Sequence, residues 1–425
     1  MPTVVLFATL ASLLVINVPI AVALGLASVV LLLMMGDIPL MVVVQRMYTA
    51  NDSYKLLAVP FFMIAGELMT YGGASRRLVE FAGSIVGHFK GGLAAVAIVS
   101  SAFFAALSGS NAATVAAIGG VMIPAMLRKG YPADYTAATM AASGSTGMVI
   151  PPSILMILYG VVVGVSIGDL FIAGFAPGIL LAASMLLVNW YICRHSNFEQ
   201  QSWGGFKNVI RTFKDSIWAL LTPVIILGGI YGGICTPTEA AAVAALYGLI
   251  IGMFAYKELK VKDLSTIVWR SAYSTAVVML VMATAGLFAW VITANEIPQT
   301  IAAYFSAVSP SPQVYLILVN ILLLFTGCFI NAAAQIPIMA PILYPAAASF
   351  GIDPIIFGII MTVNLSIGTV TPPLGVDLFV ASTLSKVPLE KIVVRIWPFV
   401  LALVVDLLII TYYPPLSMFL LDLLR

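Results

Sequence analysis

The sequence predicts an all-α protein that crosses a membrane many times and contains an inverted repeat. Of the 425 residues, 62% are hydrophobic and 8% are charged, whereas a soluble domain needs roughly a quarter charged residues to cover its surface. The apolar segments are roughly 16 to 25 residues long, which is the length of membrane-spanning helices rather than of barrel strands. Helix-breaking residues also recur at a spacing of 221 positions.

This spacing indicates a duplication. Pro124, Gly130, Gly147, Pro151, Pro152 and Pro177 recur as Pro345, Gly351, Gly368, Pro372, Pro373 and Pro398, and Ser145 matches Ser366. Proline and glycine mark the points where helices break. In an apolar chain, corresponding breaks in the two halves indicate the binding site of a transporter.

In the first half we expect spans at 3–17, 20–35 and 55–71, a broken span at 133–163 and a continuous span at 169–193. Residues 92–128 form two short apolar arms around the polar turn Ser108–Asn111. Two full passes would also return the chain to its starting side, but they would leave this polar turn unexplained. A re-entrant hairpin with a buried tip explains both the short arms and the turn.

The second half follows the same plan. Spans are expected at 217–234, 238–256 and 270–294, followed by a hairpin at 313–349, a broken span at 354–384 and a last helix at 396–413. The tip of this hairpin contains Thr326, Gly327, Asn331 and Gln335.

Loop charges predict the orientation, because Lys and Arg concentrate on cytoplasmic loops. The flanks of the first hairpin and the loops at 194–214, 257–270 and 386–395 are basic, whereas the flanks of the second hairpin contain no Lys or Arg. The first hairpin should therefore enter from the cytoplasm and the second from outside. About ten full passes then place both termini on the outer side.

Residues 194–216 connect the two repeats. Aromatic and aliphatic residues alternate there with Lys and Arg, a pattern that suits an amphipathic helix on the cytoplasmic interface. A solvated linker is the alternative.

The two broken spans supply oxygen atoms for cation binding. A double proline leaves upstream carbonyls without helical partners, and in hydrocarbon a bound hard cation can satisfy them. We expect each hairpin tip to meet the broken span of its own repeat and to form a Na⁺ site there. Site 1 comprises Ser108, Ser110, Asn111, Gly144, Thr146 and Gly147, and site 2 comprises Thr326, Asn331, Gly368, Thr369 and Thr371. Small polar residues also serve close helix packing, but two clusters at equivalent places of a repeat favour cation sites.

An organic-acid substrate is expected between the two sites, facing the N-terminal ends of half-helices. The residues predicted to line its site are Ser145, Pro152, Gln335, Asn364, Ser366, Pro373 and Asp377. Asp377 could instead cap a half-helix or take part in ion coupling. We expect no Lys or Arg inside the membrane that could clamp the carboxylate of the substrate.

Other classes of function find little support. His88 and His195 lie far in sequence from the serine-rich tips, and the three cysteines show no metal-ligand spacing. An intramembrane hydrolase using Ser108 or Ser110 lacks an identifiable base, so we expect no enzyme. The net charge of +2 comes from scattered loops and indicates no nucleic-acid partner.

At these motifs the chain resembles the large membrane subunit (DctM type) of tripartite ATP-independent periplasmic (TRAP) transporters. The resemblance rests on five stretches: Pro60–Glu67, Ser108–Asn111, Gly147–Pro152, Pro237–Ala240 and Gly368–Gly375. It implies membership of the ion transporter superfamily, location in a bacterial inner membrane, and Na⁺-coupled import by an elevator mechanism. It also implies a small four-helix membrane partner and a periplasmic substrate-binding protein. Asp377 departs from the family pattern, in which Asn is common.

The resemblance divides the chain into scaffold and transport parts. The scaffold would comprise residues 1–90 and 217–308, and the transport domain 91–193 and 309–425, with 194–216 as the connector. Sialic acids and C4-dicarboxylates are the implied substrate classes, with a preference for sialic acid. An autonomous Na⁺- or H⁺-coupled carboxylate carrier and a non-transporting scaffold are the alternatives.

One irregularity predicts a difference between the two sites. Asn111 matches Asn331 at a spacing of 220 rather than 221. We therefore expect related but unequal sites, with different Na⁺ affinities.

Overall fold

The computed structural model describes residues 2–36, 38–196, 198, 202–300 and 311–424, and all regular secondary structure within these ranges is helical. The boundary predicted between residues 308 and 309 and the connector residues 197 and 199–201 lie outside the described residues.

The first half contains ten helices in the described ranges. They are α1 (Pro2–Val15), α2 (Ile20–Met35), α3 (Met41–Asn51), α4 (Ala58–Tyr71), α5 (Ala74–Val86), α6 (Gly92–Ser108), α7 (Asn111–Arg128), α8 (Ala133–Gly144), α9 (Ile154–Val163) and α10 (Ile167–Cys193). Short 3₁₀ turns at Tyr54–Leu57 and Ser145–Met148 precede α4 and follow α8.

The second half repeats this order. Its described helices are α11 (Gly205–Tyr231), α12 (Pro237–Ile250), α13 (Val261–Ala294), α15 (Pro312–Gly327), α16 (Ala332–Ser349), α17 (Pro354–Gly368), α18 (Val376–Ser385), α19 (Leu389–Tyr412) and α20 (Pro415–Leu424). A π-helical turn at Ile251–Ala255 follows α12.

Both predicted broken spans are broken in the structure. The first separates α8 from α9, and the second separates α17 from α18. Each interruption contains a proline pair joined by a cis peptide bond, Pro151–Pro152 and Pro372–Pro373. Proline lacks the N–H that a continuing helix requires, so the repeated proline pair interrupts the helix in each half.

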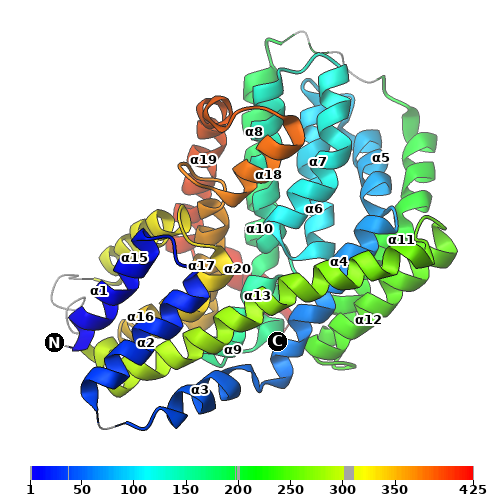
Figure 1. The fold of residues 1–425 in the computed structure, drawn as a ribbon. Helices are drawn as coiled ribbons and strands as arrows, with labels where there is room; N and C mark the ends of the chain where they lie inside the picture. The colour runs from blue at the N-terminus through cyan, green and yellow to red at the C-terminus, as the bar shows by residue number, and fades with distance from the viewer. Residues whose placement is uncertain (1, 37, 197, 199–201, 301–310, 425) are drawn as a thin grey trace.

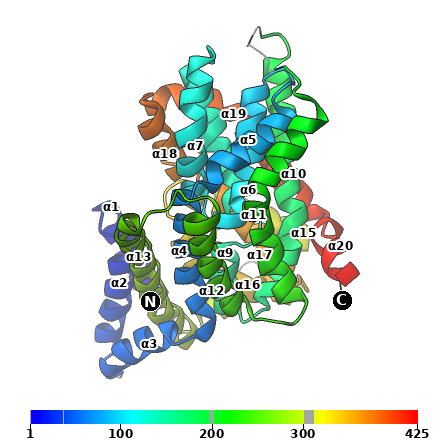
Figure 2. The same cartoon turned by 90° about the vertical axis from the view of Figure 1, so that its right-hand side faces the viewer.

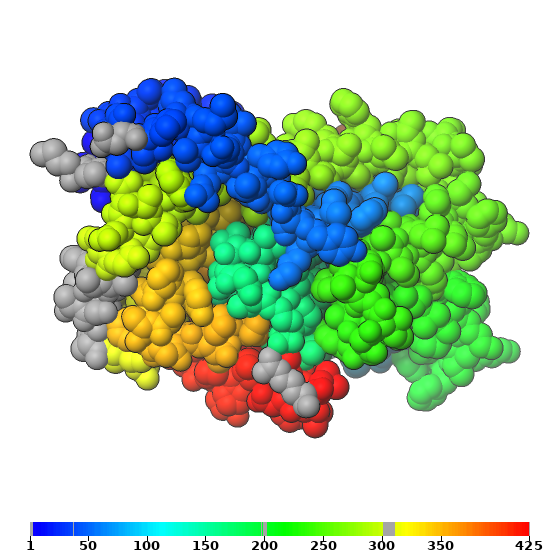
Figure 3. All heavy atoms as spheres, turned by 90° about the horizontal axis from the view of Figure 1, so that it is seen from below, coloured from blue at the N-terminus to red at the C-terminus, as the bar shows by residue number. Residues whose placement is uncertain are grey.

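The two helix pairs predicted as hairpins occupy opposite parts of the molecule. In Figures 1 and 2, α6 and α7 lie in the upper part and α15 and α16 in the lower part. The start of α1 and the end of α20 lie in the lower part, whereas the end of α10 and the start of α11 lie in the upper part. Figure 3, seen from below, places α9 (teal) between α16 (orange) and α12 (green). This arrangement agrees with an inverted repeat.

Several helix boundaries differ from the sequence prediction. α13 begins at Val261 rather than at residue 270, because Asp263 accepts a hydrogen bond from the Lys260 backbone N–H and caps a helix that starts among charged residues. Residues 205–216 form the first turns of α11, so the predicted separate interfacial helix is wrong for them. The exposed Phe206 and Ile210 on these turns account for the amphipathic pattern. Helices α3, α5 and α20 were not predicted.

Among the described residues, six helices are long and apolar enough to cross a membrane. The count is seven if the run Tyr54–Tyr71 and the helix α5, bent by 68° relative to each other, form one span. Eight further apolar helices have 10–17 residues. The chain is therefore a multi-helix membrane protein, and the count of about ten passes stays a prediction.

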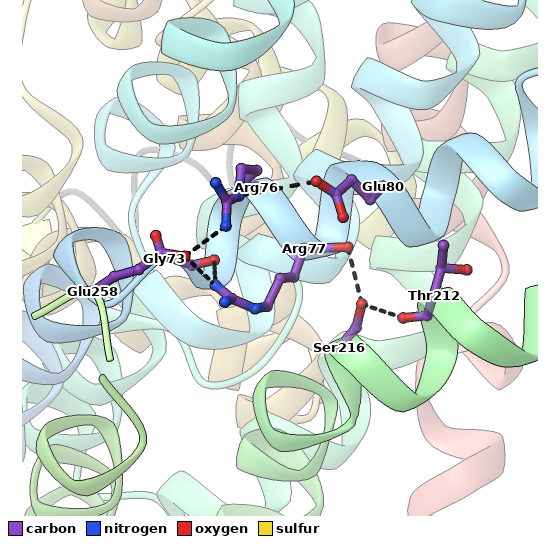
Figure 4. Close-up of polar contacts among 7 residues, drawn as sticks. All are labelled: Gly73, Arg76, Arg77, Glu80, Thr212, Ser216 and Glu258. Carbon is purple, nitrogen blue, oxygen red and sulfur yellow. Dashed lines mark hydrogen bonds and ion pairs between the residues drawn. The ribbon is translucent and has the colours of Figure 1, made fainter. Parts of the chain in front are cut away.

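An ion cluster ties α5 to the segment between α12 and α13 (Figure 4). Glu258 accepts hydrogen bonds from Arg76 at 2.6 Å and from Arg77 at 2.8 Å. Ser216 of α11 donates to the Arg77 carbonyl oxygen at 2.9 Å, and the Arg77 guanidinium lies 3.8 Å from the centre of the Tyr256 ring. These contacts hold α5, α11 and the loop before α13 together.

Candidate functional site

Each hairpin tip packs against the broken span of its own half. A Cβ added to Gly147 would lie 2.6 Å from the carbonyl oxygen of Ser110, and a Cβ added to Gly327 would lie 3.0 Å from the Cα of Gly368. The backbone N–H of Ile154, just after the first proline pair, also donates to the Gly109 carbonyl at 3.4 Å. The glycines are thus required where two backbones approach closely.

Asn111 joins the two halves of the site. Its Oδ1 accepts a hydrogen bond from the Met148 backbone N–H at 2.8 Å, within its own repeat. Its Nδ2 donates to Ser366 Oγ at 2.9 Å and to Thr369 Oγ1 at 2.8 Å, both in the other repeat. An amide has two N–H donors and one carbonyl, so this fully buried side chain satisfies its carbonyl within its own repeat and its N–H groups across the interface between the repeats.

The equivalent serines of the two repeats contact each other. Ser366 donates to the carbonyl oxygen of Ser145 at 2.5 Å. In a two-fold arrangement, a residue touches its own equivalent only close to the axis. The pseudo-two-fold axis of the repeat therefore passes beside this pair, at the two helix interruptions.

Asn331 takes a different position from Asn111. Asn331 is the N-cap of α16, is exposed, and accepts a hydrogen bond from the Ala333 N–H at 2.9 Å. In the first repeat Ser110 is the N-cap, so Asn111 is the first residue of α7. The one-residue shift seen in the sequence thus turns one asparagine into a helix cap and frees the other to reach across the repeat interface.

The residues predicted for cation site 1 come together only in part. Ser108 Oγ lies 2.9 Å from Thr114 Oγ1, and Thr114 donates to the Ser110 carbonyl at 2.8 Å. Gly147 packs on the same carbonyl. By contrast, the Thr146 hydroxyl donates to Ser143 within its own turn at 2.8 Å. Gly144 packs against Val115.

Thr114 was missed by the sequence analysis. It lies four residues after Ser110, so the two share one face of a helix, and this spacing was the available signal. The resulting cluster contains hydroxyl and carbonyl oxygens, which are the donors that hard cations prefer. In the described part of the chain, no three His, Cys, Asp or Glu residues gather as a metal site.

The residues predicted for cation site 2 are divided between two networks. Thr326 Oγ1 donates to Gln335 Oε1 at 2.9 Å, and Gln335 Nε2 donates to the Ile330 carbonyl at 2.9 Å, all within the tip. Thr369 instead belongs to the Asn111 network and donates to Asp377 Oδ2 at 2.7 Å. The Thr371 hydroxyl donates to the carbonyl oxygen of Ile367, one turn earlier in the chain, at 2.7 Å. The two predicted sites are therefore linked through Asn111 and Thr369.

A cavity of about 260 Å³ lies where both tips and both interruptions converge. Its wall includes Ser110, Asn331, Met148, Thr369 and Asp377 from these elements and Met63, Tyr273, Ser274 and Val277 from α4 and α13. Asp377 is fully buried, and within the described residues its Oδ1 has no hydrogen-bond partner.

Asp377 lines this cavity, whereas the other six residues predicted to bind substrate are not part of its wall. Ser145 and Ser366 bond to each other behind it, and Gln335 is held within the second tip. Asn364 donates to Asn320 at 3.0 Å, away from the tips. Pro152 is buried, whereas Pro373 is exposed. Of the predicted substrate residues, Ser145 and Ser366 therefore join the two repeats, and Gln335 and Asn364 hold helices of the second half together.

A second cavity, of about 390 Å³, adjoins the first. The two cavities share Met63, Ser110, Ile154 and Ser274 in their walls, and the second adds Glu67, Tyr71 and Arg270. Arg270 is the tenth residue of α13, which starts at Val261 rather than at residue 270, and its side chain is exposed. The long apolar stretch after residue 270 had hidden the earlier start of the helix.

These features define a membrane transport permease built on an inverted repeat. The model of the DctM family, the DctM component of tripartite ATP-independent periplasmic transporters, matches residues 7–416. The chain belongs to this family of large TRAP permease subunits and is a transport protein rather than an enzyme.

Named relatives cover most of the chain. It is 43% identical over 98% of its length to the isethionate TRAP permease DctMQ of Oleidesulfovibrio alaskensis, and it spans 66% of that protein. It is 36% identical to the C4-dicarboxylate large permease DctM of Rhodobacter capsulatus, with all of both chains covered. It is 35% identical to the sialic acid large permease SiaM of Vibrio cholerae, with 95% of each chain covered.

Solved structures support the fold alone. The YdaH transporter of Alcanivorax borkumensis matches with a TM-score of 0.61 at 16% identity, over 88% of this chain and 87% of that one. MtrF of Neisseria gonorrhoeae matches with a TM-score of 0.57 at 14% identity, over 88% of this chain and 83% of that one.

Proposed function

We propose that the chain is the large subunit of a Na⁺-coupled importer of organic anions, in which α6–α9 and α15–α18 move as one body against α1–α4 and α11–α13. The observation that carries the proposal is the Asn111 network, which joins the two helix interruptions beside a cavity walled by both bodies. A body held together in this way can carry a site past a separate layer of helices.

Cation coupling is supported by the type of donors at the first tip. Ser108, Thr114 and the Ser110 carbonyl gather oxygens next to the Gly147 backbone. A cation bound there would hold tip and helix interruption together, and so would favour the arrangement that closes the cavity.

The substrate is proposed to be an organic acid that a periplasmic binding protein delivers, with a small membrane subunit completing the permease. The names of relatives include a sulfonate (isethionate), C4-dicarboxylates, sialic acid and 2,3-diketo-L-gulonate. Their shared chemistry is an anionic group on a small polar molecule. This range does not single out sialic acid, so the substrate is proposed at the level of organic anions.

The orientation is proposed from the loop charges. The end of the molecule where α10 stops and α11 starts carries basic residues and lies opposite the start of α1 and the end of α20. By the positive-inside rule it is cytoplasmic, which places both termini on the periplasmic side of the inner membrane.

The test is uptake by proteoliposomes that contain the chain and its small partner. Succinate, isethionate and N-acetylneuraminate are offered, each with and without a solute-binding protein that binds it. We expect uptake only when an inward Na⁺ gradient and the binding protein are both present. Uptake without the binding protein would indicate an autonomous carrier. Uptake that is the same with and without a Na⁺ gradient would refute Na⁺ coupling.

A further inference from the structure

The second cavity has a charge pattern that the import mechanism described above does not use. Glu67 and Arg270, which carry opposite charges, both line it. The Arg270 guanidinium lies 5.8 Å from the centre of the Tyr71 ring, and no described carboxylate lies within ion-pairing distance of it. Arg270 is an exposed residue on a helix long enough to cross the membrane, so its guanidinium is accessible to an anion that enters the cavity.

A second observation at the same wall also points to a ligand. Ser271, next to Arg270, is 5% exposed, and its hydroxyl oxygen has no hydrogen-bond partner within the described chain. A buried hydroxyl without a partner is uncommon and suggests an unseen partner. A guanidinium beside a free hydroxyl matches the oxygen atoms of a carboxylate or a sulfonate.

The position of the second cavity along α13 shows toward which side of the membrane it lies. The first cavity reaches α13 at Tyr273–Val278, and the second reaches it at Arg270–Ser274. Moving from Val278 to Arg270 advances about 12 Å along a helix, toward the basic residues Arg76, Arg77, Lys257 and Lys260. By the positive-inside rule this is the cytoplasmic end.

The cavity also lies where two layers must slide past each other. A Cβ on Gly66 of α4 would lie 3.2 Å from the Cα of Ser108 in the first tip, so the glycine next to Glu67 allows close passage of the tip. Ser110 lines both cavities and therefore stands at the passage between them.

We propose that this cavity is a release site for the transported organic anion on its way to the cytoplasm, with Arg270 receiving its carboxylate or sulfonate group. Glu67 competes for the same guanidinium and so shortens the time for which the anion remains bound to Arg270. This inference rests on the proposed direction of import, but it makes a claim about a separate site.

The test measures the charge and access of the cavity without requiring transport. Cys193, Cys235 and Cys328 are replaced, and Ser271→Cys is introduced as the only thiol. Inside-out vesicles are then treated with membrane-impermeant methanethiosulfonate reagents, one carrying a sulfonate and one carrying a trimethylammonium group. We expect the sulfonate reagent to react faster than the cationic reagent, relative to the same pair of rates at an exposed Thr383→Cys control on α18.

Charge variants decide the role of Arg270. Arg270→Gln should lower the ratio of anionic to cationic rates by roughly three- to tenfold, as expected for removal of one nearby charge. Arg270→Lys should largely restore the ratio, and Glu67→Gln should raise it. A ratio that Arg270→Gln leaves unchanged, or a thiol of the Ser271→Cys variant that no reagent reaches from the cytoplasmic side, would overturn the proposal.

Protection by the substrate completes the test. Succinate or isethionate in the millimolar range should slow labelling of the Ser271→Cys thiol when Arg270 is present and should not slow it in Arg270→Gln. Protection that persists in Arg270→Gln would show that the anion binds elsewhere and would overturn the proposal. If the labelling results hold but wild-type proteoliposomes show no Na⁺-driven uptake, then the import function fails and the anion site stands.

Discussion

Replacing Asn111 by alanine should weaken the protein more than any other single change at the tips. The variant loses the hydrogen bonds to Met148, Ser366 and Thr369. Hydrogen bonds between helices in membranes are worth about 0.6 kcal/mol each on average, and a buried N–H left without a partner costs about 1 to 3 kcal/mol. We therefore expect Asn111→Ala to lower the free energy of unfolding by about 2 to 4 kcal/mol.

Asn331→Ala is the matched control, because Asn331 is the repeat counterpart of Asn111. It removes one cap hydrogen bond at an exposed helix start. Loss of such a cap costs about 1 kcal/mol. The two variants delete the same side chain, so the difference between them reports the network rather than the residue type.

Thermal unfolding of the purified permease, with and without Na⁺, measures both the loss of stability and the stabilisation by Na⁺. A bound ion stabilises the folded protein by mass action, so wild type should melt at a higher temperature in NaCl than in choline chloride. Asn111→Ala should lose most of this shift, and Asn331→Ala should keep much of it. Equal destabilisation by the two variants, or an unchanged Na⁺ shift in Asn111→Ala, would refute the reasoning.

Two further predictions concern packing and charge. Gly147→Ala would place a methyl group 2.6 Å from the Ser110 carbonyl and should destabilise the protein by about 1 to 3 kcal/mol in the same melting assay. Gly120→Ala, on open α7 surface, should be neutral or stabilising, and similar melting of both variants would argue against the close contact. Glu258→Gln removes the shared partner of two arginines and should cost about 1 to 2 kcal/mol. Glu80→Gln, which breaks only an exposed ion pair at 3.9 Å, should cost less than about 0.5 kcal/mol. A larger loss of stability in Glu80→Gln than in Glu258→Gln would refute the stabilising role of the ion cluster.

The broken helices and the hairpins could be predicted because they depend on local chemistry. A proline pair removes two backbone donors wherever it occurs, so Pro151–Pro152 and Pro372–Pro373 mark the interruptions without any knowledge of their neighbours. The polar turn at Ser108–Asn111 also depends on local chemistry, because Gly109 ends α6 in a left-handed conformation that glycine adopts readily. The start of α13 was harder to predict, because the capping Asp263 lies among charges that are equally typical of a loop.

The partners of the site residues could not be predicted in the same way. Thr369 was placed with the second tip because it lies in the second interruption, yet its hydroxyl oxygen accepts a hydrogen bond from Asn111 of the first tip. Asn364 is as polar as Asn111, but it faces Asn320 instead of the cavity. Sequence spacing fixes which residues share a helix face, but it does not fix which helices from the two halves come together.

The sequence alone therefore determined the class of the protein, the repeat and the places where its helices stop. These features follow from hydrophobicity and from the backbone limits of proline and glycine, which act within a few residues. The tertiary structure decided which asparagine bridges the repeats, which acid faces the cavity, and that Arg270 shares a cavity with Glu67. Those outcomes depend on contacts between segments more than 200 residues apart in the chain, such as that between Ser145 and Ser366, and only the packed fold brings such segments together.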